Sequence, residues 1–207
     1  MDITIEDFEF SSPGRDTGIA RTISEAHEDT LVRAAANGDD GAFCRLVEMH
    51  QERVFHFCYR WLRNSEDAKE ATQDTFIRVY EAIPRYEKKG RLATWLYRIS
   101  LNLCRDYNKS KSSRQRRATG SIDEEISPTI CPLAHPDETA ALADERERMQ
   151  EAIMDLPDKL RSVVILFGLE GLSQKECAEV LHCSVRAVEG RLYRARDILM
   201  TVRDQGS

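Results

Sequence analysis

The sequence lacks the features of a membrane, secreted or fibrous protein. None of its 207 residues belongs to an apolar run of 18, the length that a membrane-spanning helix requires. The first 30 residues hold eight acidic and two basic residues, the opposite of the basic and then apolar start of a signal peptide. Aromatic residues are only 7%, and six prolines and ten glycines are too few for a collagen-like chain. We therefore expect a cytoplasmic globular protein without membrane insertion.

The cysteines also lack the spacing of a metal site. Six cysteines include no C-x-x-C pair, and the five histidines do not cluster beside them. The best zinc candidate, Cys177 with His182 and Cys183, has no fourth ligand. We therefore predict no metal and no other cofactor. Three thiols fall within predicted helices, where a free cysteine packs like a small apolar residue: Cys44, Cys58 and Cys104.

The charge is unevenly distributed. The net charge is −6, and residues 1–30 alone account for −6. Residues 85–117 contain eleven bases and two acids, whereas residues 118–148 contain eight acids and two bases. Binding of a polyanion depends on such local patches rather than on the net charge. The acidic total is thus compatible with a nucleic-acid partner.

Hydrophobic periodicity predicts helices throughout. Apolar residues recur every three or four positions in residues 43–62, 68–83 and 92–103, with Asn64 and Pro84 as breaks. No strand-like alternation of useful length occurs. The predicted fold is therefore all-α.

The same pattern predicts two small helical domains joined by a flexible linker. Residues 1–23 show no sustained period and are expected to form a disordered acidic tail. A short helix near 29–36 opens the first domain, residues 24–113. Residues 114–137 hold a basic cluster, acids and three prolines, which indicates a linker. Helical periodicity resumes at 138, so the second domain is expected over residues 138–203.

The second domain contains a predicted helix-turn-helix. Ser173 and Glu176 have the spacing of a capping box at the start of a short helix, residues 174–181. His182 and Cys183 form the turn, and Ser184 is placed to cap the next helix. A short helix, a tight turn and a longer helix are typical of proteins that read the DNA major groove.

The longer helix has one apolar and one polar side. Apolar residues at spacings of three and four are expected to face the core: Val185, Val188, Leu192, Ala195, Leu199 and Val202. The outward side carries Arg186, Glu189, Gly190, Tyr193, Arg194 and Asp197. Arginine can bond bidentately to guanine, and a carboxylate can accept from cytosine. The alternative is an ordinary helical hairpin with a solvated basic face.

The basic segment 85–117 has aromatic residues among its bases. They are Tyr86, Trp95, Tyr97 and Tyr107. Bases attract phosphate, and aromatic faces can stack on unpaired nucleobases. A core tryptophan inside a solvated basic helix is the alternative, and the local charge favours nucleic acid.

Three motifs in order make the chain resemble the extracytoplasmic-function (ECF) group of bacterial sigma-70-type sigma factors. Asp67-Ala-Lys-Glu-Ala-Thr-Gln-Asp-Thr-Phe76 is similar to the family's polymerase-binding motif. Thr94-Trp-Leu-Tyr-Arg-Ile99, followed by Asn102 and bases, resembles its −10 reading and promoter-melting region. Leu156-Pro157 and the segment ending in Arg191-Leu-Tyr-Arg-Ala-Arg196 resemble its −35 reading domain.

The resemblance implies a site for each motif. Core RNA polymerase would be bound by Asp67, Glu70, Gln73, Asp74 and Phe76. The −10 element would be bound by Tyr86, Arg91, Trp95, Arg98, Asn102 and Arg105. The −35 element would be bound by Ser184, Arg186, Glu189, Arg191 and Arg194. The acids of the first motif could equally form a solvated helix face.

The resemblance implies an alternative sigma factor, a subunit that directs core RNA polymerase to specific promoters. It would not be an enzyme, because nucleotide chemistry stays in the core polymerase. Family members are often held inactive by an anti-sigma factor, so such a partner is a further candidate. The alternatives are a stand-alone helix-turn-helix regulator and a metal-dependent enzyme. No long heptad supports a dimeric regulator, and no ligand spacing supports the enzyme.

Overall fold

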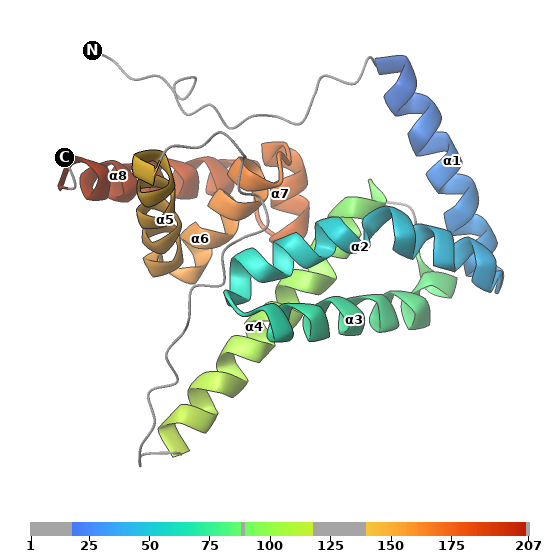
Figure 1. Cartoon of the computed structure of the whole chain (residues 1–207). Coiled ribbons are helices and arrows are strands. Elements are labelled where there is room, and N and C mark those ends of the chain that lie inside the picture. Colours follow the sequence, from blue (N-terminus) through green and yellow to red (C-terminus); the bar gives the residue numbers. More distant parts are fainter. Residues whose placement is uncertain (1–17, 88–89, 118–139, 206–207) are drawn as a thin grey trace.

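The computed structural model describes residues 18–87, 90–117 and 140–205, with side chains within 26–87, 90–110 and 148–202. These residues form two groups of helices and contain no strand (Figure 1). The N-terminal group holds α1 (Gly18–Ala36), α2 (Asp40–Leu62), α3 (Ser65–Ala82), a short 3-10 turn η2 (Ile83–Arg85) and α4 (Leu92–Arg117). The C-terminal group holds α5 (Ala140–Asp155), α6 (Asp158–Val163), a π-helical turn η3 (Val164–Leu169), α7 (Gln174–Val180) and α8 (Val185–Gln205). The all-α prediction is confirmed.

Local capping explains where α2 and α3 begin and end. The Asp39 carboxylate accepts a hydrogen bond from the Ala42 amide at 3.0 Å and starts α2. Arg63 ends α2 in a left-handed conformation, with φ of 52°. Asn64 then caps α3 by accepting from the Asp67 amide at 2.9 Å. Because only two residues join the helices, α2 and α3 must fold back on each other.

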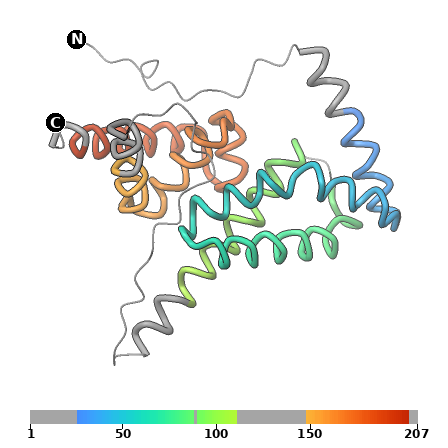
Figure 2. Tube along the Cα trace, viewed as in Figure 1, coloured from blue at the N-terminus to red at the C-terminus, as the bar shows by residue number. Residues whose placement is uncertain are grey.

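The core of the N-terminal group lies between α2, α3 and α4, which pack against one another (Figure 2). Phe57 and Trp61 of α2 are fully buried there. Ala68 and Ala71, also fully buried, let α3 approach closely. A fully buried Thr75 donates to the backbone carbonyl of its own helix, so its hydroxyl is satisfied.

The structure corrects two boundaries and one core assignment. Helix α1 begins at Gly18, inside the segment expected to be a disordered tail, and α4 runs to Arg117, inside the expected linker. The remainder of both segments, with Cys131, lies outside the described residues. Cys44 is exposed, although Cys58 and Cys104 are buried as predicted. Cys44 lies outside the apolar stripe of α2. On such a helix, the side that a residue faces decides its burial more than its residue type does.

The core of the C-terminal group is centred on the apolar stretch around η3. Val163, Ile165 and Leu166 are fully buried. Helices α6 and α7 both pack against α8. Helix α7 also packs against α4, so the two groups lie in contact. Every described helix is too short or too polar to cross a membrane.

Candidate nucleic-acid and polymerase interfaces

Two aromatic rings stack at the start of α4. The Tyr86 and Trp95 ring centroids are 4.4 Å apart with an interplanar angle of 30°. Tyr86 follows η2, whose position after α3 is fixed by Pro84. Both rings are partly buried, so each keeps an accessible edge or face. Burial, then the nearby Glu28 and Asp29 carboxylates, raises the pKa of Tyr86, which keeps its hydroxyl neutral.

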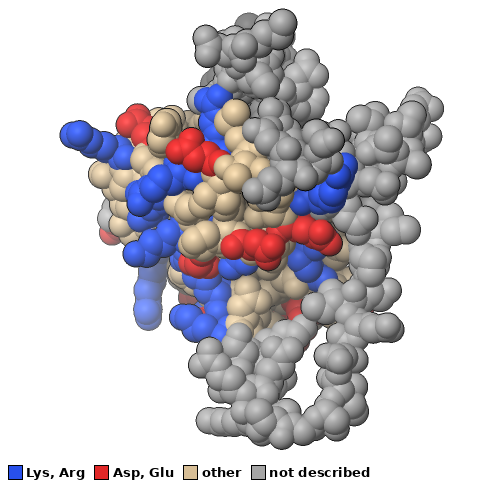
Figure 3. Space-filling view, turned by 90° about the vertical axis from the view of Figure 1, so that its left-hand side faces the viewer, with Lys and Arg blue, Asp and Glu red and all other residues tan. Residues whose placement is uncertain are grey.

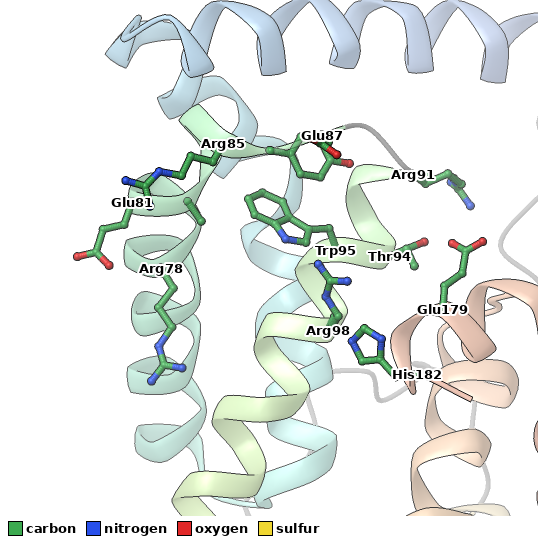
Figure 4. A pocket seen from close by; sticks show the side chains of 13 residues that line it. Arg78, Glu81, Arg85, Glu87, Arg91, Thr94, Trp95, Arg98, Glu179 and His182 are labelled. Atoms are coloured by element: carbon green, nitrogen blue, oxygen red, sulfur yellow. The ribbon is translucent and has the colours of Figure 1, made fainter. Parts of the chain in front are cut away.

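A cleft of about 770 Å³ opens beside this stack. Arginines from α3, η2, α4 and the residue just before α4 line it, and Figure 4 shows their side chains around Trp95: Arg78, Arg85, Arg98 and Arg91. Acidic side chains, Glu81 and Glu87, share the rim. The far wall belongs to α7, from which Glu179 and His182 point toward α4 (Figure 4). The cleft is large enough for an unstacked nucleotide.

The structure brings together four of the six residues predicted to bind the −10 element. Tyr86, Arg91, Trp95 and Arg98 all line the cleft. Asn102 is exposed farther along α4, outside the cleft. Arg105 is directed to the C-terminal group, where Nε donates to Asp158 at 3.1 Å and Nη2 donates to Ser162 at 3.0 Å.

The residues predicted to bind polymerase lie on α3 at different depths. Glu70 and Gln73 are exposed, whereas Asp67 and Asp74 are partly buried. The Tyr107 hydroxyl of α4 donates to Asp74 at 3.1 Å. Burial, with this bond and the Glu70 charge, raises the Tyr107 pKa. Phe76 is buried in the core, so it holds α3 in place and does not contribute to the exposed face.

Sequence reasoning missed two apolar residues of the exposed α3 face. Ile77 has 56% of its surface exposed, and Tyr80 is similarly exposed. Ile77 follows Gln73 by one helical turn, so periodicity could have placed it on the same face. The Tyr80 hydroxyl donates to Asp40 at 2.9 Å, and this bond raises the Tyr80 pKa.

The helix-turn-helix has the predicted caps. The Ser173 hydroxyl accepts from the Glu176 amide at 3.3 Å, and the Ser173 amide donates to the Glu176 carboxylate at 2.8 Å. Burial alone would raise the Glu176 pKa, but hydrogen bonds from Ser173 and the Arg91 guanidinium outweigh it and lower the pKa. His182 forms the turn with φ of 48°, and Ser184 caps α8 by accepting from the Ala187 amide at 3.2 Å.

Helix α8 is held by a narrow buried seam. Val188, Ala195 and Leu199 are buried, and Leu192 is partly buried. The prediction that Val185 and Val202 face the core is wrong, because both are exposed near the two ends of α8. In Figure 3, basic side chains gather along one side of the described surface, and acidic ones form a band across it.

The outward side of α8 carries most of the predicted −35 residues. Arg186, Glu189 and Arg194 are exposed. Arg194 Nε donates to the Gly190 carbonyl at 2.9 Å, and the partly buried Arg191 donates to Cys183 Sγ at 3.5 Å. Tyr193, 69% exposed, lies among them although it was not counted as a DNA contact.

The family models for Sigma-70 region 2 and Sigma-70 region 4 match residues 46–114 and 146–199. The chain belongs to the ECF group of sigma-70 family sigma factors. It is 29% identical over 177 residues to ECF RNA polymerase sigma factor SigW of Bacillus subtilis, covering 81% of this chain and 92% of SigW. It is also 29% identical to the ECF sigma-E factor of Haemophilus influenzae, covering 83% and 93% of the two chains. Among solved structures it is similar to CnrH in complex with the cytosolic domain of CnrY, with TM-score 0.65, 28% identity, and coverage of 87% and 99%.

The membership fixes the activity. The sigma factor binds core RNA polymerase and promoter DNA, and it directs promoter-specific initiation without being an enzyme. The alternative of a stand-alone helix-turn-helix regulator does not account for a region 2 match upstream of region 4. Hereafter "region 2" denotes α1 to α4, and "region 4" denotes α5 to α8.

The sigma factor shows no metal site within the described side chains, where no three potential ligands lie together. Cys177 of region 4 is fully buried, and this burial raises its pKa to about 12. A neutral buried thiol serves as a packing group rather than as a ligand.

Polar contacts join region 2 to region 4. Among the described side chains, ion pairs cross between them in which the base belongs to region 2: Arg60–Glu170, Arg91–Glu176 and Arg105–Asp158. Arg63 also donates to Gln150 at 2.9 Å, and the Tyr97 hydroxyl donates to Glu170 at 2.6 Å. Burial, with the Glu170 carboxylate, raises the Tyr97 pKa. These contacts were not predicted from the sequence.

Proposed function

We propose that the sigma factor uses three separate surfaces to bind promoter DNA and core polymerase. The aromatic cleft of region 2 captures an unpaired base of the −10 element. The outward side of α8 reads the −35 duplex. The exposed side of α3 docks on core polymerase.

The Tyr86–Trp95 stack beside the arginine-lined cleft carries the proposal for the −10 element. Stacking on an aromatic side chain contributes about 1–3 kcal/mol per base, which offsets part of the cost of unpairing. Arg98 of α4 lies on the cleft wall next to Trp95, within reach of the polar edge of a base that enters the cleft. The four arginines make the cleft attractive to DNA despite the acids on its rim. We assign base capture to Tyr86 and Trp95, base recognition to Arg98, and strand binding to Arg91 and Asn102.

The −35 proposal is supported by exposure and rigidity. The Ser184 cap and the buried seam hold α8 so that Arg186, Glu189 and Arg194 project from one side. A helix presented in this way fits the major groove, where Arg reads guanine and Glu reads cytosine. Tyr193 adds an exposed ring for apolar contact with a thymine methyl.

The polymerase proposal is supported by the mixed character of the α3 face. Ile77 and Tyr80 present apolar area, and Glu70 and Gln73 lie beside them. An exposed apolar patch with a charged rim is typical of a protein interface. Asp74 and Asp67 contribute charge from partly buried positions, and Phe76 supports the face from beneath.

Location and regulation follow from the activity. Because core polymerase acts in the bacterial cytoplasm, we infer that the sigma factor works there. The solved relative CnrH was captured with the cytosolic domain of CnrY. We infer that a protein of the anti-sigma class binds this sigma factor too.

The test is transcription by reconstituted holoenzyme from a promoter selected from a random library. Arg98→Ala and Arg186→Ala are each assayed on the selected promoter and on versions with either the −10 or the −35 element replaced. Loss of a specific contact costs about 1–3 kcal/mol, or roughly 5- to 150-fold in activity. The Arg98→Ala loss should vanish once the −10 element is replaced, and the Arg186→Ala loss once the −35 element is replaced. Lys159→Ala, an exposed base of α6, is the control.

Equal losses on all three templates would contradict the assignment. Such a result would mean that the two arginines contact phosphate or support folding without reading sequence. Loss of activity in Lys159→Ala would show that any removed base impairs initiation.

A further inference from the structure

A buried polar pair joins α1 to α2 within region 2. The His50 residue of α2 is only 6% exposed, and its ring Nε2 lies 2.7 Å from a Glu28 carboxylate oxygen of α1. The Glu28 side chain is itself largely buried, with 17% exposed. An ionised carboxylate only accepts hydrogen bonds, so the imidazole is the donor. Because each partner has lost most of its water, the pair favours the one arrangement of α1 and α2 in which both are satisfied.

The pair does not belong to any of the three surfaces assigned above. His50 does not line the aromatic cleft, and it lies neither on α3 nor on α8. An apolar side chain at the same depth would pack against the core without the cost of burying a polar ring. The pair therefore calls for a role in holding α1.

Helix α1 lies at the end of region 2 where α3 ends (Figure 1). It packs against α2 and against η2, the turn that directly precedes Tyr86. Two apolar residues of α1, Leu31 and Ala35, are buried in the core. Glu28 lies about one helical turn before Leu31, so the bond to His50 extends the attachment of α1 beyond its apolar contacts.

Tyr86, half of the aromatic stack, depends on such neighbours. It follows η2 with an extended backbone, φ −70° and ψ 111°, so no helix of its own fixes the ring. Burial first, and then the charges of Glu28 and Asp29, raise the Tyr86 pKa, which means that both α1 carboxylates lie near it. On the other side, the Trp95 ring is 4.4 Å away between centroids. The position of Tyr86 is thus sensitive to the position of α1.

We propose that His50 is a positioning residue of the −10 site: its hydrogen bond to Glu28 fixes α1 against Tyr86 and thereby holds the Tyr86–Trp95 stack in place for an unpaired base. The positioning of the stack rests on the contacts alone. Its effect on promoters rests in addition on the proposed function of the cleft. Loss of His50 also leaves the Glu28 carboxylate without this donor beside the cleft, where its charge opposes an incoming DNA strand.

The same helix offers a matched control. His56 of α2 also pairs with a carboxylate, at 3.7 Å, but its partner Glu52 lies on α2 itself and is 88% exposed. His56→Ala therefore removes a histidine–glutamate pair that does not reach α1. His50→Ala removes the link to α1, and His50→Gln keeps an N–H group able to donate to Glu28. His50→Gln is thus the variant that should rescue the function.

Trp95 fluorescence reports the state of the stack. The chain has two tryptophans, and because Trp61 is fully buried, acrylamide quenches mainly the partly buried Trp95. In the free full-length protein we expect His50→Ala to raise the quenching constant about twofold, since the stacked ring gains an accessible face. Helix content by circular dichroism should stay unchanged. His50→Gln and His56→Ala should both resemble the parent.

Transcription by the holoenzyme tests the effect on promoters. On the selected promoter, His50→Ala should lower activity about fivefold, less than removal of a direct base contact. The loss should disappear once the −10 element is replaced and persist when the −35 element is replaced. Added to Trp95→Ala, His50→Ala should cause no further loss, because a residue that acts through the stack has no effect once the stack is gone. His56→Ala should be as active as the parent.

The two readouts separate this proposal from the assignment of the cleft. Suppose that quenching rises in His50→Ala, while His50→Ala and Trp95→Ala both lose activity equally on every template. The positioning of the stack would then stand, and the assignment of the cleft to the −10 element would be overturned. Unchanged quenching in His50→Ala would overturn the positioning role. Additive losses of His50→Ala and Trp95→Ala would overturn it too, since His50 would then support region 2 as a whole.

A second pair of variants applies if His50→Ala loses helix content. Glu28→Gln keeps an acceptor for His50, whereas Glu28→Ala removes it from the α1 side. We expect Glu28→Ala to raise the quenching constant of Trp95 and Glu28→Gln to leave it at the parent value. Equal quenching constants in these two variants would overturn the proposal.

Discussion

Replacing Trp95 by alanine tests whether the aromatic cleft opens DNA. The substitution removes a ring stacked 4.4 Å from Tyr86 and leaves the arginines in place. An aromatic pair is worth about 0.5–1.5 kcal/mol beyond its buried area, and a stacked base about 1–3 kcal/mol. A loss of about 2 kcal/mol on the base corresponds to roughly 30-fold fewer open complexes. We therefore expect a strong defect in strand opening and little change in affinity for core polymerase.

The assay compares open-complex formation on a duplex promoter and on one premelted across the −10 element. The premelted template carries no unpairing cost, so it should recover most of the activity of Trp95→Ala. Trp95→Phe keeps a stacking ring of smaller area, and its defect should be intermediate. Thermal melting of each free protein measures the loss from the Tyr86 stack separately, since that loss is independent of DNA.

Equal defects on the duplex and the premelted template would refute the reasoning. Trp95 would then be a partly buried packing residue, and its removal would impair region 2 as a whole. A fall in melting temperature that tracks the activity loss across the alanine and phenylalanine variants would lead to the same conclusion.

Three further predictions concern the other surfaces. Asp74→Lys should weaken binding to core polymerase in a competition assay. Tyr107→Phe removes only the hydrogen bond to Asp74 and should leave this binding unchanged. Equal effects of the two substitutions would mean that the hydrogen bond matters more than the charge. Arg194→Ala should weaken binding to the preferred −35 duplex by about 1–3 kcal/mol in a titration, with no loss on unrelated duplexes; a uniform loss would mark a phosphate contact. Ser173→Ala should destabilise region 4 by about 1 kcal/mol in chemical unfolding, since it removes a capping box. Ser184→Ala, with a single 3.2 Å cap bond, should cost less, and the reverse order would contradict the capping argument.

Local signals in the sequence were sufficient for the helix-turn-helix. The Ser173 cap, the turn at His182 and the Ser184 cap each depend on residues within a few positions, and all three occur as predicted. The apolar period of α8 was correct in its middle and wrong at its ends. Periodicity indicates which side of a helix faces its neighbours, but it does not indicate over what length of the helix that side is buried.

Helix lengths were predicted less well than helix positions. α4 extends into a segment rich in charge, where no apolar stripe marks the helix, and α1 begins well ahead of the short helix predicted near residues 29–36. Lysine, arginine and glutamate are good helix formers, so a helix can continue past its last core contact. Phe76 was predicted to bind polymerase because it belongs to the motif, but a motif does not indicate how deeply each of its residues is buried.

The contact between the two regions could not be predicted from the sequence. Glu170 is a single acid after an apolar stretch, and its partner Arg60 lies 110 positions away. Nothing in either local pattern distinguishes this pair from solvated charges. Its significance arises only from burial, which is a property of the assembled fold.

The narrow attachment of α8 has a consequence for how promoter preference changes over evolution. Among the described side chains of α8, only Val188, Ala195 and Leu199 are buried, so the outward side of the helix is free of packing constraints. Substitutions at Arg186 or Glu189 should alter base preference at little cost in folding, because exposed positions away from caps tolerate change. Duplicated copies of such a gene can therefore diverge toward separate regulons by a few exposed replacements. For the same reason, α8 is a suitable cassette for building orthogonal transcription circuits, with the buried seam kept and the outward positions randomised.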